Sequence, residues 1–237
     1  MSFDLKGMNI LITGASSGIG RQAALTYGKR RANIIALGRS QSALETLDDD
    51  LVKYNCNVSL VPFNLMQFDL IKDMEQKLSE RIDHLDVLFL NAAAFGSLTP
   101  ITHITEAEWN ETFAVNLTSN VIFLKLFEPY LKKTNQSQVL ITTTEIINQK
   151  KPFWGLYSAS KAALEQIAYS YAEETQNTNI KVNLIDPGIV NTKLRLKAYP
   201  GEDKQKITQP SDLSDFFEDI LFNDKFTNGE LIRYADW

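Results

Sequence analysis

The strongest constraint on the fold of this chain is a strand, a glycine-rich turn and a helix that follow one another near its N-terminus. Residues 8–12 are apolar and predict a short buried strand, and residues 21–31 predict a helix. Between them stands the segment Thr13-Gly14-Ala15-Ser16-Ser17-Gly18-Ile19-Gly20. Its glycines let the backbone turn tightly and approach a pyrophosphate, whose charge the N–H groups of the new helix would meet. Because the spacing Gly-x-x-x-Gly-x-Gly differs from the usual Gly-x-Gly-x-x-Gly, a tight turn without a ligand remains the alternative.

Apolar runs recur along the chain and alternate with helix-like segments. They lie near residues 8–13, 33–38, 58–63, 86–90, 138–142, 180–185 and 230–233. This alternation is typical of an α/β fold, and it predicts a doubly wound parallel sheet of about seven strands with helices on both faces. With 237 residues, 44% of them hydrophobic, and no Pro/Gly/Ser-rich linker, we expect a single domain over residues 1–237.

Tyr157 and Lys161 are one helical turn apart in the segment Tyr-Ser-Ala-Ser-Lys. On a helix their side chains share a face, and a nearby ammonium favours the ionised phenol, so we expect Lys161 to lower the pKa of Tyr157. Such a tyrosine can act as an acid or base. The alternative is a core tyrosine beside a solvated lysine.

The overall charge narrows the classes of partner. A formal net charge of −5 and a pI near 5.2 argue against a nucleic-acid or anionic-membrane surface. The one basic triplet, Lys29-Arg30-Arg31, is interpreted as the solvated end of the first helix. No apolar signal region opens the chain, and no run approaches the about 18–20 residues that span a bilayer, so we expect a cytoplasmic protein.

Cysteine and histidine are scarce. Cys56 is the single cysteine, which excludes an internal disulfide, and with only His84 and His103 beside it we expect no metal site. Both histidines are expected at the surface.

These motifs, in this order, resemble the short-chain dehydrogenase/reductase family over nearly the whole chain. Asn91-Ala92-Ala93-Ala94 is similar to the family's Asn-Asn-Ala-Gly segment, which braces the sheet beside the cofactor, although its second and fourth positions differ. Asn116 matches the family's helix asparagine. Pro187-Gly188-Ile189-Val190-Asn191-Thr192 matches the segment that meets the nicotinamide. The resemblance implies a Rossmann-like fold, with a cofactor-binding half over about 1–95 and a catalytic half over about 96–237.

The resemblance also implies which residues bind a nicotinamide cofactor. The implied set is Gly14, Ser16, Ser17, Gly18, Ile19, Gly20, Asn64, Leu65, Asn91, Ala92, Tyr157, Lys161, Pro187, Gly188, Ile189, Val190 and Thr192. Asn64 stands where the family usually has Asp, and a plain turn residue is nearly as good an interpretation. Relatives that use NADP sometimes carry a second basic residue at the position of Ser17.

Cofactor choice depends on the end of the second predicted strand. NAD enzymes usually place an acid there to hold the ribose hydroxyls, whereas this chain has Gly38-Arg39-Ser40. An arginine can bind a 2′-phosphate through two N–H bonds, so Arg39 favours NADP(H) over NAD(H). An ordinary exposed arginine is the alternative.

The resemblance assigns the catalytic roles to Asn116, Thr144, Tyr157 and Lys161. Thr144 replaces the usual serine thirteen residues before Tyr157; its hydroxyl would orient a substrate carbonyl, with Thr143 as the fallback and a strand end without a catalytic part as the alternative. Tyr157 would exchange the proton, Lys161 would bind the nicotinamide ribose, and Asn116 would hold a relaying water.

The segment after Thr192 is the family's variable lid, here about 193–210, and it looks similar to bacterial oxidoreductases of the YciK type. Arg195 and Lys197 could bind an acidic group of a substrate, but we favour a role in locking the lid. The expected apolar cleft residues are Phe95, Ile146, Phe153, Trp154 and Tyr199.

Three functions follow from the sequence. The favoured one is an NADP(H)-dependent carbonyl reductase or alcohol dehydrogenase that acts on a small carbonyl or alcohol substrate. The others are an NADP(H)-binding regulatory protein that has lost turnover, and a scaffold that uses only the fold. The resemblance implies a homodimer or homotetramer, and we expect Trp237 to be packed.

Overall fold

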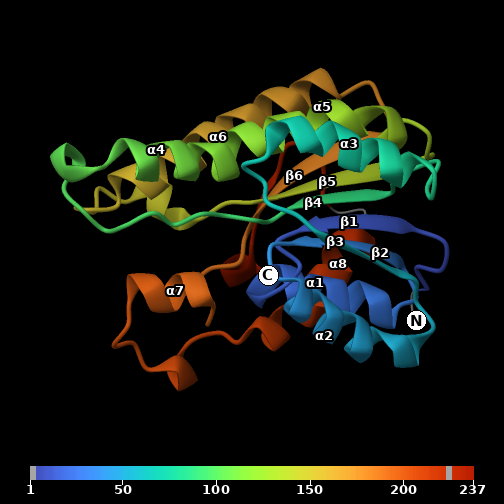
Figure 1. The fold of residues 1–237 in the computed structure, drawn as a ribbon, viewed down its shortest axis with the longest axis horizontal. Helices are drawn as coiled ribbons and strands as arrows, with labels where there is room; N and C mark the ends of the chain where they lie inside the picture. The colour runs from blue at the N-terminus through green and yellow to red at the C-terminus, as the bar shows by residue number, and fades with distance from the viewer. Residues whose placement is uncertain (1–3, 223–225) are drawn as a thin grey trace.

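The computed structural model describes residues 4–222 and 226–237, and its centre is a parallel β-sheet (Figure 1). Within these residues seven strands pair in the order β3-β2-β1-β4-β5-β6-β7. They are β1 Asn9–Thr13, β2 Asn33–Gly38, β3 Val58–Pro62, β4 Val87–Leu90, β5 Ser137–Thr142, β6 Ile180–Asp186 and β7 Leu231–Arg233. The predicted α/β fold with a doubly wound sheet is therefore confirmed.

Helices cover both faces of the sheet (Figure 1). One face carries α1 Gly18–Lys29, α2 Gln41–Leu51 and α8 Ser214–Phe222; the other carries α3 Phe68–Ser79, α5 Ser119–Leu131 and α6 Gly155–Glu174. α4 Glu106–Phe113 leads into α5 through one π-helical turn, Ala114–Thr118, and α7 Lys193–Ala198 stands away from the sheet. Short 3₁₀ turns occupy Val52–Tyr54, Ile101–His103, Glu145–Asn148, Lys204–Lys206, Pro210–Leu213 and Tyr234–Asp236.

Strand residues divide between two apolar cores. Ile10 and Ile12 of β1 pack with α1, α2 and α8, whereas Leu11 between them packs with α3, α5 and α6. Because successive strand side chains point to opposite faces, a strand buried on both sides reads as a continuous apolar run. This is why the sequence showed unbroken apolar segments rather than alternation.

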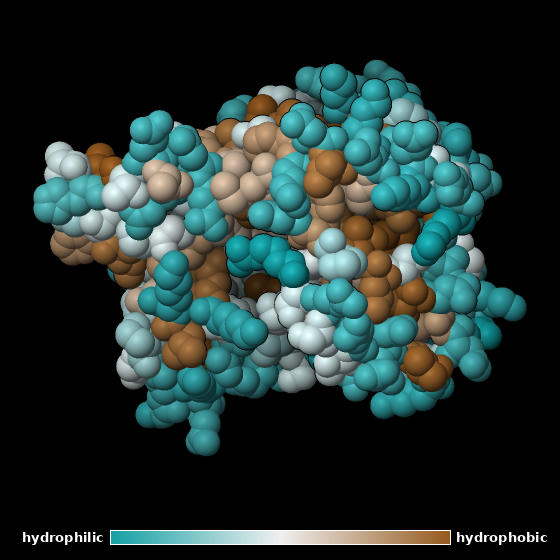
Figure 2. Space-filling view, in the orientation of Figure 1, coloured by the Kyte–Doolittle hydropathy of each residue, from teal (hydrophilic) through white to brown (hydrophobic). Residues whose placement is uncertain are grey.

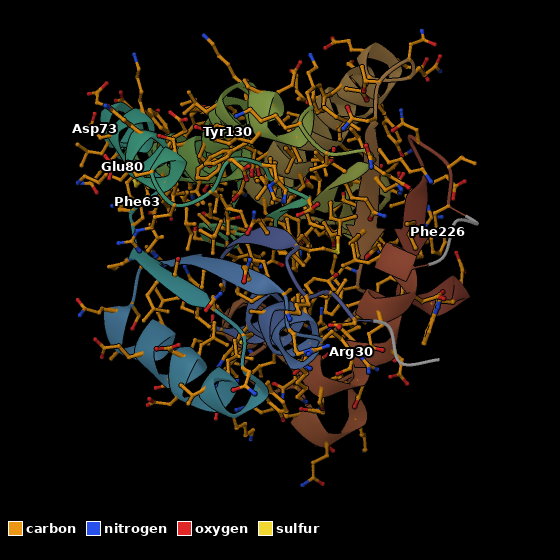
Figure 3. All side chains as sticks on the ribbon, turned by 90° about the vertical axis from the view of Figure 1, so that its right-hand side faces the viewer. Arg30, Phe63, Asp73, Glu80, Tyr130 and Phe226 are labelled. Carbon is orange, nitrogen blue, oxygen red and sulfur yellow. The ribbon has the colours of Figure 1, made fainter. Side chains whose placement is uncertain are left out.

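The basic triplet at the end of α1 is only partly a solvated helix end, since Lys29 and Arg31 are exposed whereas Arg30 is half-buried. Arg30 forms a bidentate ion pair with Glu218 of α8, through Nε at 2.9 Å and Nη2 at 2.7 Å, and Arg31 pairs with Asp4. Figure 3 shows Arg30 where α1 meets the C-terminal elements. The sequence interpretation was wrong only for Arg30, because α8, which supplies its partner, lies far away along the chain.

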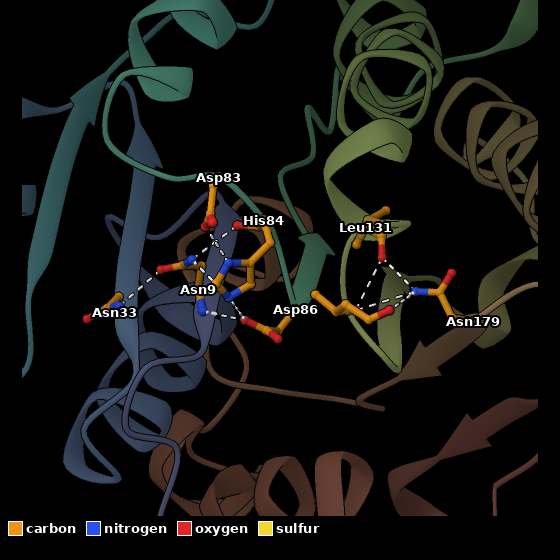
Figure 4. Close-up of polar contacts among 8 residues, drawn as sticks. Asn9, Asn33, Asp83, His84, Asp86, Leu131 and Asn179 are labelled. Carbon is orange, nitrogen blue, oxygen red and sulfur yellow. Dashed lines mark hydrogen bonds and ion pairs between the residues drawn. The ribbon is translucent and has the colours of Figure 1, made fainter.

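A polar network lies at the amino ends of the strands, and His84 is part of it (Figure 4). His84 Nδ1 lies 2.5 Å from Asp83, and Nε2 lies 3.4 Å from Asp86. The backbone N–H of Asn9 donates to Asp86 at 2.7 Å, and the Asn9 side chain donates to the carbonyl of His84. His84 therefore differs from the expected surface residue, while His103 is exposed as expected.

Trp237 is packed on its own chain. Its ring stacks on Tyr234, meets Phe216 edge to face at 5.8 Å, and its Nε1 donates to Asp219 at 2.7 Å. The expectation of a packed Trp237 is met only in part, because the ring has these contacts while about half of its surface remains exposed.

Candidate active site

A cavity of about 450 Å³ opens at the carboxyl ends of the strands. Figure 2 shows a hollow near the middle of this face, apolar inside and bordered by hydrophilic residues. It lies where the sheet order reverses between β1 and β4, the usual ligand position in open α/β sheets. Predicted site residues in its lining are Gly14, Ser16, Ser17, Gly18, Ile19, Arg39, Asn64, Leu65, Asn91, Ala92, Thr144, Tyr157, Lys161, Pro187, Gly188, Ile189, Val190 and Thr192. Gly20 and Asn116 lie outside the lining.

The first turn requires glycines because other parts of the chain approach its backbone closely. Gly14 and Gly18 have positive φ angles of 73° and 57°. A Cβ on Gly18 would lie 3.1 Å from Thr192 Cγ2, and one on Gly20 would lie 2.6 Å from the Gly14 carbonyl oxygen and 2.5 Å from Asn91 Nδ2. Gly18 thus keeps open the space between the turn and Thr192, while Gly20 lets α1 begin directly beside the end of β4.

Asn91 ties together the ends of three strands. Its Nδ2 donates to the Thr13 carbonyl at 3.2 Å, and its Oδ1 accepts from Thr142 Oγ1 at 3.2 Å. Thr13 Oγ1 accepts from the backbone N–H groups of Asn91 and Ala92, at 3.0 and 3.1 Å. Sequence reasoning missed Thr13 as a site residue, although a threonine that ends a buried apolar strand was a visible signal.

The far end of the cavity suits a phosphorylated ribose. Arg39 is 77% exposed, and its nearest carboxylate, that of Glu111, is 4.0 Å away. Gly38 leaves the space that Ser16 fills, since a Cβ there would lie 2.8 Å from Ser16 Oγ. The charged residues in the cavity lining are Arg39, Lys161, Lys193 and Arg195, all of them cations. The glycine turn and this cationic lining fit an anionic dinucleotide.

Asn64 uses its side chain for a local turn. Its Oδ1 accepts from the backbone N–H of Met66 at 3.1 Å. The interpretation as a turn residue fits this bond, and the residue also lines the cavity.

Tyr157 and Lys161 lie one turn apart on α6, and both are buried. Lys161 Nζ donates to the Thr142 carbonyl at 2.8 Å, and burial lowers the pKa of Lys161 to about 8. Burial raises the pKa of Tyr157 above its ordinary value, and the negative charge of Asp186 adds to this. The expected lowering of the Tyr157 pKa by Lys161 was therefore wrong, because desolvation outweighs the ammonium. At neutral pH the phenol holds its proton and is placed as an acid.

The pH dependence of stability tests the burial of Lys161. Because its pKa falls from 10.5 to about 8 on folding, the unfolded chain binds more protons at this residue between these values. The contribution of Lys161 to the free energy of unfolding therefore rises with pH through this window and is lost as pH falls through about 8. The full effect is on the order of 3 kcal/mol. Urea titrations between about pH 8 and 10 should show a steeper rise for wild type than for Lys161→Met.

The matched control is Lys125→Met, which removes an exposed lysine of α5. Its curve should run parallel to that of wild type. Parallel curves for wild type and Lys161→Met would contradict the burial of a charged Lys161.

The two candidate threonines after β5 differ in their partners. Thr143 is buried, and its hydroxyl donates to Glu165 Oε2 at 3.2 Å. Thr144 is partly exposed in the cavity lining, and its Oγ1 accepts from the Ile146 N–H at 3.4 Å. A hydroxyl that accepts retains its own proton for another partner. These contacts favour Thr144 over Thr143 as the hydroxyl available to a ligand.

Asn116 lies in the π-helical turn between α4 and α5 and is fully buried. Its Oδ1 accepts from the Ala94 N–H at 2.7 Å, and its Nδ2 donates to the Ala94 carbonyl and to Ser160 Oγ, both at 2.9 Å. Both N–H groups are thus used within the protein, so the amide holds the segment after β4 against α6. The role expected for its side chain, holding a relaying water, is not supported by these contacts.

The sequence model of a family described as short chain dehydrogenase matches residues 8–203. The chain belongs to the short chain dehydrogenase family. A curated relative, the uncharacterized oxidoreductase YciK of Escherichia coli K12, is 31% identical over 221 residues, which cover 91% of this chain and 86% of that protein.

Solved structures agree with this membership. A protein from Shigella flexneri 2a, described as a short chain dehydrogenase complexed with NADP, is 27% identical with a TM-score of 0.91, covering 98% of this chain and 99% of that one. Another from Escherichia coli CFT073, described as complexed with NADPH, is 27% identical with a TM-score of 0.90, covering 98% of each chain.

Asp186 lies beside the cavity, directly before the lining residue Pro187, and the sequence reasoning missed it. It is 6% exposed at the end of β6, and its carboxylate accepts from the Gly188 N–H at 3.0 Å and from the backbone of Glu145. One carboxylate thus joins the turn after β6 to the turn after β5. The visible signal was an acid that ends an apolar strand directly before Pro187.

The segment predicted as the lid, residues 193–210, contains charged groups with partners inside the protein. Arg195 forms a bidentate ion pair with Glu202, at 2.6 and 2.5 Å, and Lys197 Nζ donates to the Gly96 carbonyl at 2.6 Å. These contacts fit the favoured lid-locking interpretation. Of the five residues expected to form an apolar cleft, Trp154 lines the cavity; Phe95, Ile146 and Tyr199 pack beside it, and Phe153 is exposed.

Two absences hold for the described residues. None of their helices is long and apolar enough to cross a membrane. No group of three or more His, Cys, Asp and Glu side chains among them is arranged to hold a metal ion.

Proposed function

We propose that this dehydrogenase transfers hydride between NADP(H) and a small carbonyl or alcohol substrate. The observation that supports this proposal is that one cavity is lined by Tyr157, whose pKa burial raises, by Lys161 and by Arg39. The complexes of related proteins with NADP and NADPH support the choice of cofactor.

The cofactor would be held by the turn Gly14–Gly20, by Arg39, and by the segment from Pro187 to Thr192. When bound, it supplies or accepts the hydride. Tyr157 gives its phenol proton to the substrate oxygen during reduction, and takes it back in the reverse direction. Thr144 donates to the same oxygen and orients the carbonyl. Lys161, fixed by Thr142, would bind the nicotinamide ribose and set the positive potential beside the phenol.

Thermal stability with NADPH, NADP⁺ or NADH tests this proposal. A cofactor present at ~100 times its Kd stabilises a fold by about 2.7 kcal/mol. We expect NADPH and NADP⁺ to raise the Tm more than NADH. We expect Arg39→Ala to raise the Kd for NADPH by about 10-fold or more, because a charge-assisted hydrogen bond contributes ~1.5–3 kcal/mol. The Kd for NADH serves as the control and should not change.

The outcomes separate the candidate functions. No Tm shift with any nucleotide would contradict the oxidoreductase proposal and favour a scaffold. Binding of NADPH without hydride transfer to any aldehyde or ketone would favour the regulatory alternative.

We also propose a homodimer formed through α4, α5 and α6. Each of these helices exposes a large apolar side chain, namely Trp109, Val121 and Ile167, with exposed fractions of 46%, 41% and 37%. Trp109 stacks on Phe113 with ring centroids 4.4 Å apart. Exposed apolar side chains that together form a contiguous patch mark protein contacts.

A further inference from the structure

Cationic side chains gather on and beside the predicted lid, although the chain is acidic overall with a net charge of −5. Lys193 and Arg195 line the cavity, whereas Lys150, Lys151 and Lys197 lie outside its lining. The lid helix α7 carries Lys193, Arg195 and Lys197 and no acid. Lys150 and Lys151 lie in the segment between Asn148 and α6. A local excess of one charge sign around a cleft raises the concentration of ligands of the opposite sign.

Lys151 differs from Arg195 and Lys197 in its partners. Arg195 is neutralised by Glu202, and Lys197 donates to a backbone carbonyl. Lys151 Nζ hydrogen-bonds the Tyr199 hydroxyl and lies 5.5 Å from the centre of the Trp154 ring and 4.8 Å from that of Tyr199. Among the residues that the structure describes, no carboxylate lies within ion-pair distance of Lys151.

Two cationic side chains lie against the Tyr199 ring. The Arg195 guanidinium lies 3.8 Å from its centre, and the Lys151 ammonium lies near it as well. Glu202 balances the first cation but nothing in the described chain balances the second. This arrangement is stabilised by a bound anion more than by water alone.

The chemistry of the pair fits a carboxylate. The Lys151 ammonium has three N–H donors, and its bond to Tyr199 uses one of them. Because the Tyr199 oxygen accepts this bond, its own O–H remains available to donate. Lys151 and Tyr199 thus offer two neighbouring donors, which match the two oxygens of a carboxylate.

Trp154 connects the pair of Lys151 and Tyr199 with Tyr157. The Trp154 ring lies 5.8 Å from Tyr199 and 6.2 Å from Tyr157, centroid to centroid, and Trp154 lines the cavity. Trp154 therefore offers an apolar surface next to both the phenol and the paired donors, which themselves lie outside the cavity lining.

We propose that the substrate is an aldehyde or ketone that carries a carboxylate, with the carboxylate on Lys151 and Tyr199, an apolar body against Trp154 and the carbonyl at Tyr157. This inference rests on the proposed carbonyl reduction. It assigns the specificity to Lys151 rather than to Arg195 or Lys197, because both of those already have partners.

The test compares 4-carboxybenzaldehyde with its neutral methyl ester at saturating NADPH. Lys151→Gln should lower kcat/KM for the acid about 10-fold, through KM, and leave the ester unchanged, because a charge-assisted hydrogen bond is lost on the acid alone. The matched control is Lys150→Gln, which removes the same charge from an exposed neighbour with no contact to Trp154 or Tyr199. Equal losses on acid and ester, or a rise of the KM for NADPH instead, would overturn the proposal.

Calorimetric binding of 4-(hydroxymethyl)benzoate, in the presence of NADP⁺, separates this proposal from the proposed function. Binding that weakens in Lys151→Gln, without turnover of either aldehyde, would support the anion site and contradict carbonyl reduction. Turnover of both aldehydes with no dependence on Lys151 would support reduction and overturn the anion site. Neither binding nor turnover would contradict both.

Discussion

Tyr157→Phe is expected to lower kcat/KM for carbonyl reduction by about 10³-fold, within the ~10²–10⁴-fold range of general acid catalysis. The substitution removes the phenol proton, which this side chain holds at neutral pH and which burial makes still harder to lose. The ring contacts with Phe95 and Trp154, at 5.4 and 6.2 Å, remain possible for phenylalanine, so the fold should be retained. The measurement is the initial rate of aldehyde reduction at saturating NADPH.

A matched control is available on the same helix. Tyr171→Phe removes the hydroxyl of a buried tyrosine of α6 that does not line the cavity, and its rate should stay within about threefold of wild type. NADPH should still raise the Tm of both variants. A Tyr157→Phe enzyme as fast as the control would show that another group supplies the proton.

Gly20→Val should cost about 3 kcal/mol of stability and weaken NADPH binding. Its Cβ would lie 2.6 Å from the Gly14 carbonyl oxygen, a backbone atom that no rotamer change can move away. Overpacking typically costs ~1–3 kcal/mol, and the helix propensity of valine offsets only a few tenths of this. Because Gly14 lines the cavity, relief of the clash must also displace the turn. Urea unfolding and NADPH titration measure the two effects.

Gly201→Val is the control for the Gly20 substitution. A Cβ at Gly201 would meet nothing within 4 Å, and the residue does not have a positive φ. It should change the free energy of unfolding by no more than about 0.5 kcal/mol, as surface substitutions do. Equal stability of the two variants would mean that the contact between α1 and the first turn has little energetic weight.

The strands could be predicted from the sequence because their apolar runs are local. All seven observed strands lie within or within one residue of the predicted runs, from Asn9–Thr13 to Leu231–Arg233. The first helix begins at Gly18, three residues before the predicted start, because the turn leads directly into it. Parallel strands buried on both faces leave an unambiguous signal of this kind.

The position of the candidate site could be predicted from the sequence, but the hydrogen bonds that hold its residues could not. The glycine turn and the helix pair Tyr157 and Lys161 are short motifs, and their residues line the cavity. By contrast, the Asp186 carboxylate bonds the turn at Gly188 and the turn at Glu145, and only the folded sheet brings these turns together. The predicted lowering of the Tyr157 pKa was wrong for the same reason. Burial of the phenol depends on the whole fold, and the spacing of residues on one helix does not reveal it. The catalytic roles of these residues stay predictions until the variants are measured.

The packing of α8 on α1 also has a consequence for biosynthesis. Tyr27 of α1 is fully buried and donates to the Phe217 carbonyl, and the two residues are 190 positions apart. At ~5–20 residues per second, the ribosome needs roughly 10–40 seconds to add that stretch. During this time the part of the first helix that packs on α8 has no cover from its own chain, although β1, β2 and α2 already contact the helix. The surface around Tyr27 is therefore exposed to aggregation at this stage, and premature termination before α8 should yield an aggregating product rather than a weakened enzyme.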